Sequence, residues 1–331
     1  MSESLSISIA LPVRNGANYL REALDSICAQ TFSDFELVIS DNASTDETPH
    51  ICEEYARQDR RIKLSRSKVF LAQADNVNRA VDLCSGEWVK LFCHDDLMAP
   101  DCMATIARVV SGCTSRTGLI GNGEQWLYAN GYCYRKPAAP CRSENWEGRQ
   151  FLRARLLRRH TSPATVPSLT TATVRKSAWQ SCGRFDSRFL HFDAFLWTNL
   201  LMEWDYIYAP EALTTNRIHR AQIAVSARKS LRSIEDHRLF WHEFVRKYGD
   251  TLGLGLWSRF LLRSRWLGWA GLAVAVPILR GDLPNAAAVF VRTPIAGWPL
   301  LPAFVARSYR YEKRRIATLI GHVPVSEIYP T

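Results

Sequence analysis

Closely spaced cysteine pairs are missing from this chain of 331 residues. Its nine cysteines form no C-x-x-C pair and none follows Cys182, which argues against a zinc site or a dithiol redox motif. The opening residues, MSESLSISIALPV, also lack the basic start of a signal peptide. We therefore expect a cytoplasmic protein whose thiols are reduced.

Acidic residues and long apolar runs are both scarce at the end of the chain. Residues 251–331 contain ten Lys or Arg against three Asp or Glu, which leaves +7 of the total net charge of +10. The uncharged run WLGWAGLAVAVPIL has 14 residues, whereas a membrane-spanning helix needs roughly 20. Arginine and tryptophan beside such runs are typical of segments that lie in a membrane interface. We expect this tail to contact the inner face of the cell membrane. Packing on the main domain or on a second subunit stays open.

The composition of the whole chain is that of a globular protein, with 47% hydrophobic and 22% charged residues. The excess basic residues lie among prolines and apolar runs, and no nucleic-acid-binding motif accompanies them. We therefore expect no nucleic acid partner.

Strand and helix patterns alternate over the first 120 residues. Strands are predicted at 5–11, 35–40, 61–67 and 87–92, with helical spacing between them, and Ser44 or Thr45 is predicted to cap the second helix. This order predicts an α/β fold with a mostly parallel sheet and helices on both faces. Later segments are less regular, with a strand predicted over 168–176 and helices over 194–204 and 230–248.

Three aspartates stand where predicted strands end. They are Asp41 and the adjacent pair Asp95 and Asp96, and ligands collect at the carboxyl ends of parallel strands. Adjacent carboxylates raise each other's pKa unless a cation neutralises them, so the pair indicates a metal site. The alternatives are a helix N-cap for the pair and an Asx-turn for Asp41.

Five segments within residues 5–226 carry recognisable motifs. In order they are SIALPVRN, SICAQT with DNASTD, SGEWVKLFCHDDLMAP, CGRFDSRF and RIHRAQIAVS. Together they resemble the family 2 glycosyltransferases of the GT-A fold. The resemblance implies a GT-A domain over 1–226, with a nucleotide-binding half over about 1–120 and an acceptor half over about 121–226. Residues 227–331 would form a helical, basic and apolar extension that associates with the membrane.

The resemblance also implies the reaction and its partners. An inverting transferase would move a sugar from a nucleotide-sugar donor, with a UDP-sugar expected, to a hydroxyl on a glycan or lipid-linked acceptor. Such enzymes serve bacterial polysaccharide or glycolipid assembly. A homo-oligomer stays open.

The cation implied is Mg²⁺ or Mn²⁺, which prefers carboxylate oxygen and would stabilise the departing diphosphate. The resemblance makes Asp96 the direct ligand, Asp95 a ligand of metal or ribose, and His219 a further contact to the metal or diphosphate. Cys93 stands where the family usually has the first acid. The residues implied in nucleotide-sugar binding are Pro12, Val13, Arg14, Asn15, Asp41, Asn42 and Asp95.

Inverting transfer needs a base for the acceptor proton, and the resemblance assigns this role to Asp193. Phe192 replaces the glutamate that usually precedes it. A helix N-cap is the alternative for Asp193, and a loop histidine is the alternative for His219. Because Cys93 and Phe192 depart from the family pattern, we keep a second hypothesis: a catalytically weak glycosyltransferase-like module that binds sugar nucleotide or a partner protein.

Overall fold

The computed structural model describes residues 7–135, 143–157, 164–219 and 231–263, which fall into two compact units. The larger unit takes its residues from Met1–Leu127, Cys133–Arg188 and Phe192–Arg217. The smaller takes them from Tyr128–Tyr132, Phe189–His191 and Ile218–Thr331. The predicted domain boundary near residue 226 lies outside the described ranges and stays a prediction.

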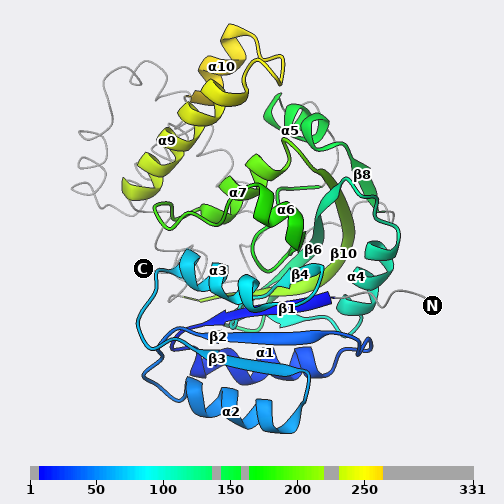
Figure 1. Cartoon of the computed structure of the whole chain (residues 1–331), viewed down its shortest axis with the longest axis vertical. Coiled ribbons are helices and arrows are strands. Elements are labelled where there is room, and N and C mark those ends of the chain that lie inside the picture. Colours follow the sequence, from blue (N-terminus) through cyan, green and yellow to red (C-terminus); the bar gives the residue numbers. More distant parts are fainter. Residues whose placement is uncertain (1–6, 136–142, 158–163, 220–230, 264–331) are drawn as a thin grey trace. The chain divides into compact units, whose positions relative to one another are not determined.

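Four parallel strands form one part of the sheet in the larger unit (Figure 1). Their order is β3-β2-β1-β4, with bounds Ile62–Arg66, Glu36–Asp41, Ile7–Val13 and Trp88–Leu91. Helices α1 (Ala17–Cys28) and α2 (Thr48–Gln58) lead from β1 towards β3, and α3 (Gln73–Leu83) leads back to β4. Because such crossovers are right-handed, α1 and α2 cover one face of these strands and α3 covers the other.

Beyond β4 the sheet is mixed. The next strands are β9 (Ala172–Arg175), β6 (Thr117–Tyr128), β10 (Asp205–Ile218) and the short β5 (Leu97–Met98). β9 runs antiparallel to both β4 and β6. β7 (Cys133–Arg135) pairs with β6, and β8 (Glu144–Trp146) pairs with β10. The predicted α/β fold with a central sheet is confirmed. After the first four strands the directions are mixed, because β9 runs antiparallel to both of its neighbours and β5 runs antiparallel to β10.

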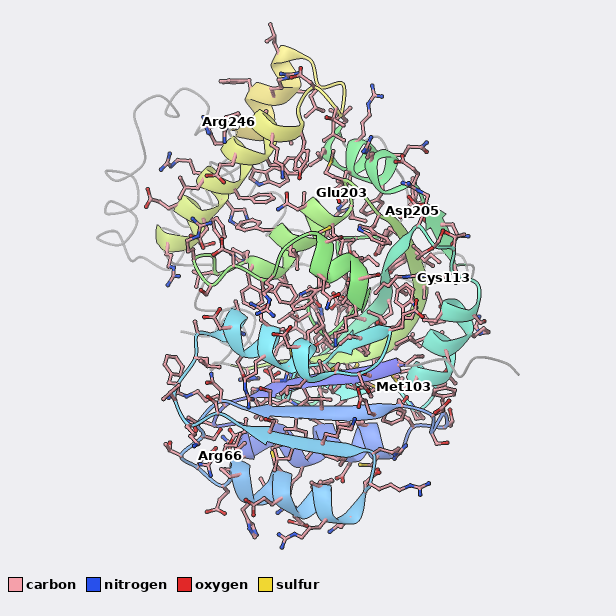
Figure 2. All side chains as sticks on the ribbon, viewed as in Figure 1. Arg66, Met103, Cys113, Glu203, Asp205 and Arg246 are labelled. Atoms are coloured by element: carbon pink, nitrogen blue, oxygen red, sulfur yellow. The ribbon has the colours of Figure 1, made fainter. Side chains whose placement is uncertain are left out.

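The core on the α1 face of the sheet is formed by apolar side chains of α1, of the parallel strands and of the helix that follows them. Helix α1 buries Leu20, Ala23, Leu24 and Ile27, which is the spacing of one apolar helix face. Strand β1 is buried on both sides, as expected of a central parallel strand. Met103 on α4 (Cys102–Ser111), labelled in Figure 2, belongs to the same core.

The structure corrects three local predictions. Helix α2 begins at Thr48 and its cap position, Glu47, makes no side-chain bond, so a cap by Ser44 or Thr45 is wrong. The strand predicted over 168–176 shortens to β9, because Thr171 N donates to Ser168 O (3.2 Å) and closes a turn before it. The helix predicted over 194–204 is α7 (Phe192–Leu200), so Asp193 lies inside its first turn rather than at its N-cap.

The larger unit also contains α5 (Gly148–Leu157) and the short α6 (Lys176–Ser181). In the smaller unit, α9 (Leu231–Tyr248) confirms the helix predicted over 230–248, and α10 (Leu256–Arg263) follows it. The predicted membrane-contacting tail lies outside the described residues from 264 onward. Within the ranges that the structure describes, no helix combines the length and the apolar character that a bilayer crossing requires.

Candidate functional site

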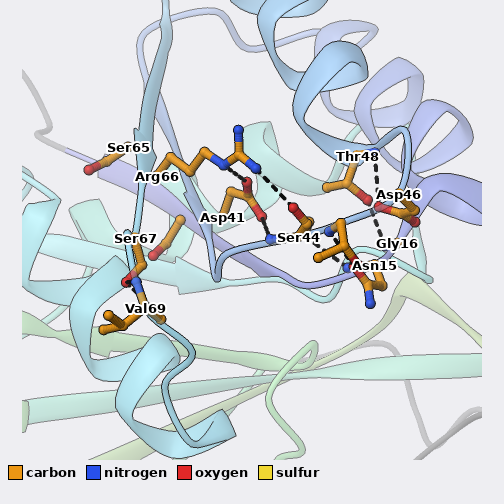
Figure 3. Close-up of polar contacts among 12 residues, drawn as sticks. Asn15, Gly16, Asp41, Ser44, Asp46, Thr48, Ser65, Arg66, Ser67 and Val69 are labelled. Carbon is orange, nitrogen blue, oxygen red and sulfur yellow. Dashed lines mark hydrogen bonds and ion pairs between the residues drawn. The ribbon is translucent and has the colours of Figure 1, made fainter.

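Asp41, the last residue of β2, is fully buried beside a half-exposed arginine. Its Oδ1 accepts the Ser44 amide (3.2 Å), and its Oδ2 lies 3.2 Å from Arg66 Nε at the end of β3. That ion pair lacks hydrogen-bond geometry, so Oδ2 has no hydrogen-bond partner among the described residues. Arg66 also donates to Ser44 O (2.9 Å). Figure 3 shows these contacts at the carboxyl ends of the strands, and Figure 2 labels Arg66 in the whole chain.

Two turns at this edge are tied together by side chains (Figure 3). Asn15, after β1, has a positive φ of 47°, a conformation that asparagine tolerates better than most residues. Its amide donates to Ser44 Oγ (2.9 Å), and the Thr45 amide donates to its side-chain oxygen (2.9 Å). Asp46 accepts the amides of Ala17 (3.2 Å) and Thr48 (3.0 Å), which begin α1 and α2. The sequence segments PVRN and DNASTD are therefore one structural unit.

The loop between β3 and α3 is fastened to the same edge at both ends. The Ser67 amide donates to Asp41 O (2.8 Å), and the Leu71 amide donates to Asn42 Oδ1 (2.7 Å). Asn42 Nδ2 returns a bond to Leu71 O (2.8 Å), so its side chain holds this loop. The loop presents Phe70, 63% exposed, and the Arg14 guanidinium lies over that ring at 3.9 Å.

An acidic cluster lies directly beyond β4. One ligand atom each from Cys93, Asp95 and Asp96 lies within 4.8 Å of the others. Strand β4 is buried along its whole length and delivers these residues to the carboxyl edge of the sheet. The two adjacent aspartates and Cys93 thus lie close together, and no helix N-cap is formed there, because the short strand β5 follows.

Asp96 is almost fully buried and lacks a counter-ion. Thr170 Oγ1 donates to its Oδ2, and the Arg217 amide donates to its Oδ1 (2.9 Å). Neither partner supplies a formal charge, and none of the described residues forms an ion pair with this carboxylate. Burial, together with the charge of Asp95, raises the pKa of Asp96 to about 8. A cation here would relieve that excess of negative charge.

The chemistry of the three side chains decides which cation they fit. Two carboxylates supply the hard oxygen ligands that Mg²⁺ and Mn²⁺ prefer. Burial and the charges of Asp96 and Asp95 raise the pKa of the Cys93 thiol, so it stays protonated at neutral pH and is a poor ligand for these ions. Asp95 and Asp96 therefore fit a hard divalent ion, and Cys93 contributes little to it.

Asp193 lies in the first turn of α7, close enough to Cys93 for its charge to raise the pKa of that thiol. Burial raises the pKa of Asp193 itself, while the backbone amides of Ala194 and Leu169 act in the opposite direction. The Ala194 amide lies 2.8 Å from its Oδ1. The neighbouring Phe192 packs edge-on against Phe185 at 5.2 Å, so the residue that replaces the family's glutamate serves the core.

The structure thus gathers Asp95, Asp96 and Asp193 around Cys93, and it gathers the PVRN and DNASTD turns around Asp41. His219 follows β10 and belongs to the smaller unit, and its contact with a metal stays a prediction. Sequence reasoning missed the partners of these acids, which are Arg66, Thr170 and Arg217. It also missed Lys90, which binds the Thr170 carbonyl. Only the buried position of Lys90 within an apolar strand could have been noticed beforehand.

Arg217 is the last residue of the larger unit and braces the acidic turn. Its Nε donates to Asp95 O (3.0 Å), and its Nη2 pairs with Glu22 on α1 (2.7 Å). Its guanidinium also lies over the Tyr19 ring at 5.0 Å. The first arginine of RIHRAQ is therefore a structural partner of the acids, which the motif alone did not indicate.

Sequence comparisons relate the chain to known proteins. The model of the family described as Glycosyl transferase family 2 matches residues 8–114. An uncharacterized glycosyltransferase of Rickettsia prowazekii (strain Madrid E) is 27% identical over 246 residues, which cover 73% of this chain and 72% of that protein. Glycosyltransferase GlyA of Streptococcus pneumoniae is 33% identical over 105 residues, which cover 31% of this chain and 15% of that protein.

Structural comparisons extend the similarity beyond the matched segment. TarS 1-349 of S. aureus in complex with UDP-GlcNAc superposes with a TM-score of 0.59 at 16% identity, covering 86% of this chain and 90% of that one. The mannosyltransferase PcManGT from Pyrobaculum calidifontis, in complex with GDP-Man and Mn²⁺, gives 0.56 at 19% identity, covering 92% and 85%. At these identities the likeness concerns the fold.

Proposed function

The chain is a member of the family 2 glycosyltransferases with the GT-A fold, and we propose that it transfers a sugar with inversion from a nucleotide-sugar donor to an acceptor hydroxyl. The observation that carries this proposal is the cluster of Asp95, Asp96 and Cys93 within 4.8 Å at the end of β4. The buried Asp96 carboxylate forms no ion pair with any described residue, and a second carboxylate, Asp95, stands beside it. Such a pair is suited to a divalent cation and, through it, to a diphosphate.

Asp95 and Asp96 would hold Mg²⁺ or Mn²⁺, and the ion would supply positive charge to the departing diphosphate. The related fold of PcManGT has been solved with Mn²⁺, which supports this assignment. Asp96 Oδ1 and Oδ2 each accept one protein hydrogen bond, and each oxygen keeps a further lone pair for the ion. His219 remains a proposed additional contact.

Asp193 would act as the base. The acceptor oxygen attacks the anomeric carbon, the bond from that carbon to the diphosphate oxygen breaks, and Asp193 takes the hydroxyl proton. Burial raises the pKa of Asp193, which makes the carboxylate a stronger base than an exposed aspartate. Its position near Cys93, and so near the acidic cluster, supports this role.

The nucleoside would lie along the edge formed by Pro12, Val13, Arg14, Asn15 and Asp41. Arg14 and Asn15 are exposed at this edge, and Asp41 has a buried oxygen without a hydrogen-bond partner among the described residues. Asn42 would contribute by holding the 67–71 loop, since its amide already binds Leu71. TarS has been solved with UDP-GlcNAc, and we propose a UDP-sugar as the donor.

We further propose that the acceptor is a glycan or lipid-linked sugar at the inner face of the cell membrane, within polysaccharide or glycolipid assembly. The support is the sequence of residues 251–331, where basic and tryptophan-flanked apolar runs coincide. Full-length protein should float with anionic vesicles at low salt and be released at high salt. Recovery in the unbound fraction at low salt would contradict this part.

A screen of sugar nucleotides with Mn²⁺ tests the proposed reaction. The matching donor should raise the melting temperature by mass action, and Mn²⁺ should accelerate its slow hydrolysis when no acceptor is present. The protonated thiol of Cys93 favours a second candidate, a module that binds sugar nucleotide without turning it over. Tight donor binding with neither hydrolysis nor transfer would favour that candidate.

A further inference from the structure

Lys90 is a lysine in the interior of β4, surrounded in sequence by apolar residues and fully buried. Burial lowers its pKa to about 8, and a charged group is retained in such a place only where it makes specific bonds. Its Nζ donates to Asn122 Oδ1 (2.9 Å) and to Thr170 O. Asn122 in turn donates to Thr214 Oγ1 (3.1 Å) on β10. Lys90 thus joins β4 to β6 and to the turn before β9.

That turn, Ser168–Thr171, is bonded to one of the two acids and influences the other. Thr170 Oγ1 donates to Asp96 Oδ2, and the same oxygen accepts the Cys93 amide (3.3 Å). The backbone amide of the preceding residue, Leu169, lowers the pKa of Asp193. Two consecutive residues of one turn therefore act on the proposed metal ligand and on the proposed base.

The turn depends on the sheet for its position. The Asn122 amide donates to Thr171 O (3.0 Å), and the Ser168 amide donates to Thr171 Oγ1 (2.8 Å). These bonds close the turn and attach one end of it. The Thr170 carbonyl, between the two acid contacts, is attached by Lys90. Without the ammonium, this buried carbonyl and Asn122 Oδ1 would each lose a donor.

We propose that Lys90 is a positioning residue that fixes the Ser168–Thr171 turn, so that Thr170 orients Asp96 for the cation and the Leu169 amide stays near Asp193. This inference rests on the proposed function. It explains how one geometry is imposed on two acids that are 97 positions apart in the sequence. Groups that orient a metal ligand typically change metal affinity by about 10- to 100-fold when removed.

The first test compares Thr170→Val with Thr170→Ser by calorimetric titration with Mn²⁺ in the presence of UDP. Valine removes the hydroxyl at nearly constant shape, and serine retains it. We expect Thr170→Val to weaken Mn²⁺ binding by about 10-fold or more, and Thr170→Ser to stay within about 3-fold of the wild type. The matched control is Thr173→Val on β9, because Thr173 is equally buried and its hydroxyl has no partner among the described residues.

Equal Mn²⁺ affinity in Thr170→Val and the wild type would overturn the inference and leave the proposed function intact. Absence of Mn²⁺ binding by the wild-type protein itself would overturn both. An equal loss in Thr173→Val would show that any buried substitution near this sheet has the same effect, which also overturns the inference.

The second test uses Lys90→Met and the pH dependence of transfer. The Leu169 amide lowers the pKa of Asp193. If the turn moves away, that pKa should rise, so the acidic limb of the pH–rate profile should move to higher pH. Reduced stability alone lowers the amount of folded enzyme and does not move that midpoint. A folded Lys90→Met protein with unchanged Mn²⁺ affinity and an unchanged acidic limb would overturn the role of the lysine. If Lys90→Met does not fold, Lys90→Arg, which keeps the charge and the donors, should restore folding and both properties.

Discussion

The ends of β2 and β4 carry buried aspartates in opposite electrostatic surroundings. Asp41 faces the Arg66 guanidinium at 3.2 Å, so the chain itself supplies its counter-charge. Asp96 faces a second carboxylate, and among the described residues it has two neutral hydrogen-bond donors and no counter-ion. The chain thus supplies a counter-charge to Asp41, whereas the described residues supply none to Asp96. Under the proposed function, Asp41 belongs to the nucleoside site and Asp96 to a site that a cation from solution would complete.

Replacing each aspartate by its amide should distinguish the two sites most strongly. Asp96→Asn should lower transfer by on the order of 10³-fold, because the ion contributes several kcal/mol to the leaving group. Asp41→Asn should weaken donor binding while keeping its dependence on Mn²⁺. Initial rates and donor titrations with each variant measure both effects. Loss of the Mn²⁺ dependence in Asp41→Asn would remove the distinction.

Asp193→Asn should reduce transfer by about 10²-fold, the usual size of a lost acid–base step. Donor affinity should change little, because Asp193 is assigned to the acceptor side of the reaction. Turnover of donor and acceptor, with UDP binding as the control, provides the measurement. Near-normal turnover would move the base to another residue.

The free energy of unfolding should respond to pH through Asp96. Its pKa of about 8 lies above the ordinary value, so the folded, metal-free protein holds an extra proton between about pH 4 and 8. The stabilisation tied to that proton is fully present below about pH 4 and is lost as pH rises through 8. With chelator present, the free energy of unfolding of Asp96→Asn should therefore rise relative to that of the wild type by at least about 1 kcal/mol between pH 5 and pH 8. A difference that does not change with pH would contradict the unpaired state of Asp96.

Removing the counter-charge of Asp41 should make the β2 site resemble the β4 site. Arg66→Gln leaves the buried carboxylate without its ion pair and removes the bond to Ser44 O, which should cost about 1–2 kcal/mol of unfolding free energy. The matched control is Arg21→Gln, whose pair with Glu54 is solvent-exposed and should change the unfolding free energy much less, because water screens it. Equal effects in urea denaturation would show that burial of Asp41 does not matter.

Site residues could be predicted from the sequence where they directly follow a recognisable strand. Asp41, Asp95 and Asp96 could be predicted because each directly follows an apolar strand pattern, and parallel strands bring their carboxyl ends to one edge. Thr170 and Arg217 could not, because they reach Asp96 from 74 and 121 positions away through strands whose pattern is irregular. The antiparallel pairing of β9 with β4 and β6 could not be predicted for the same reason. The mistaken cap at Ser44 or Thr45 arose because the Ser44 hydroxyl binds the β1–α1 turn instead of the helix end.

The central claim is that a divalent cation held at the end of β4 binds the donor diphosphate. It is tested most directly by titrating UDP into the wild-type protein, once with Mn²⁺ and once with chelator. The account predicts that UDP affinity falls at least about 10-fold in chelator, since the metal-bridged contacts to the diphosphate are lost. Equal affinity under both conditions would contradict it.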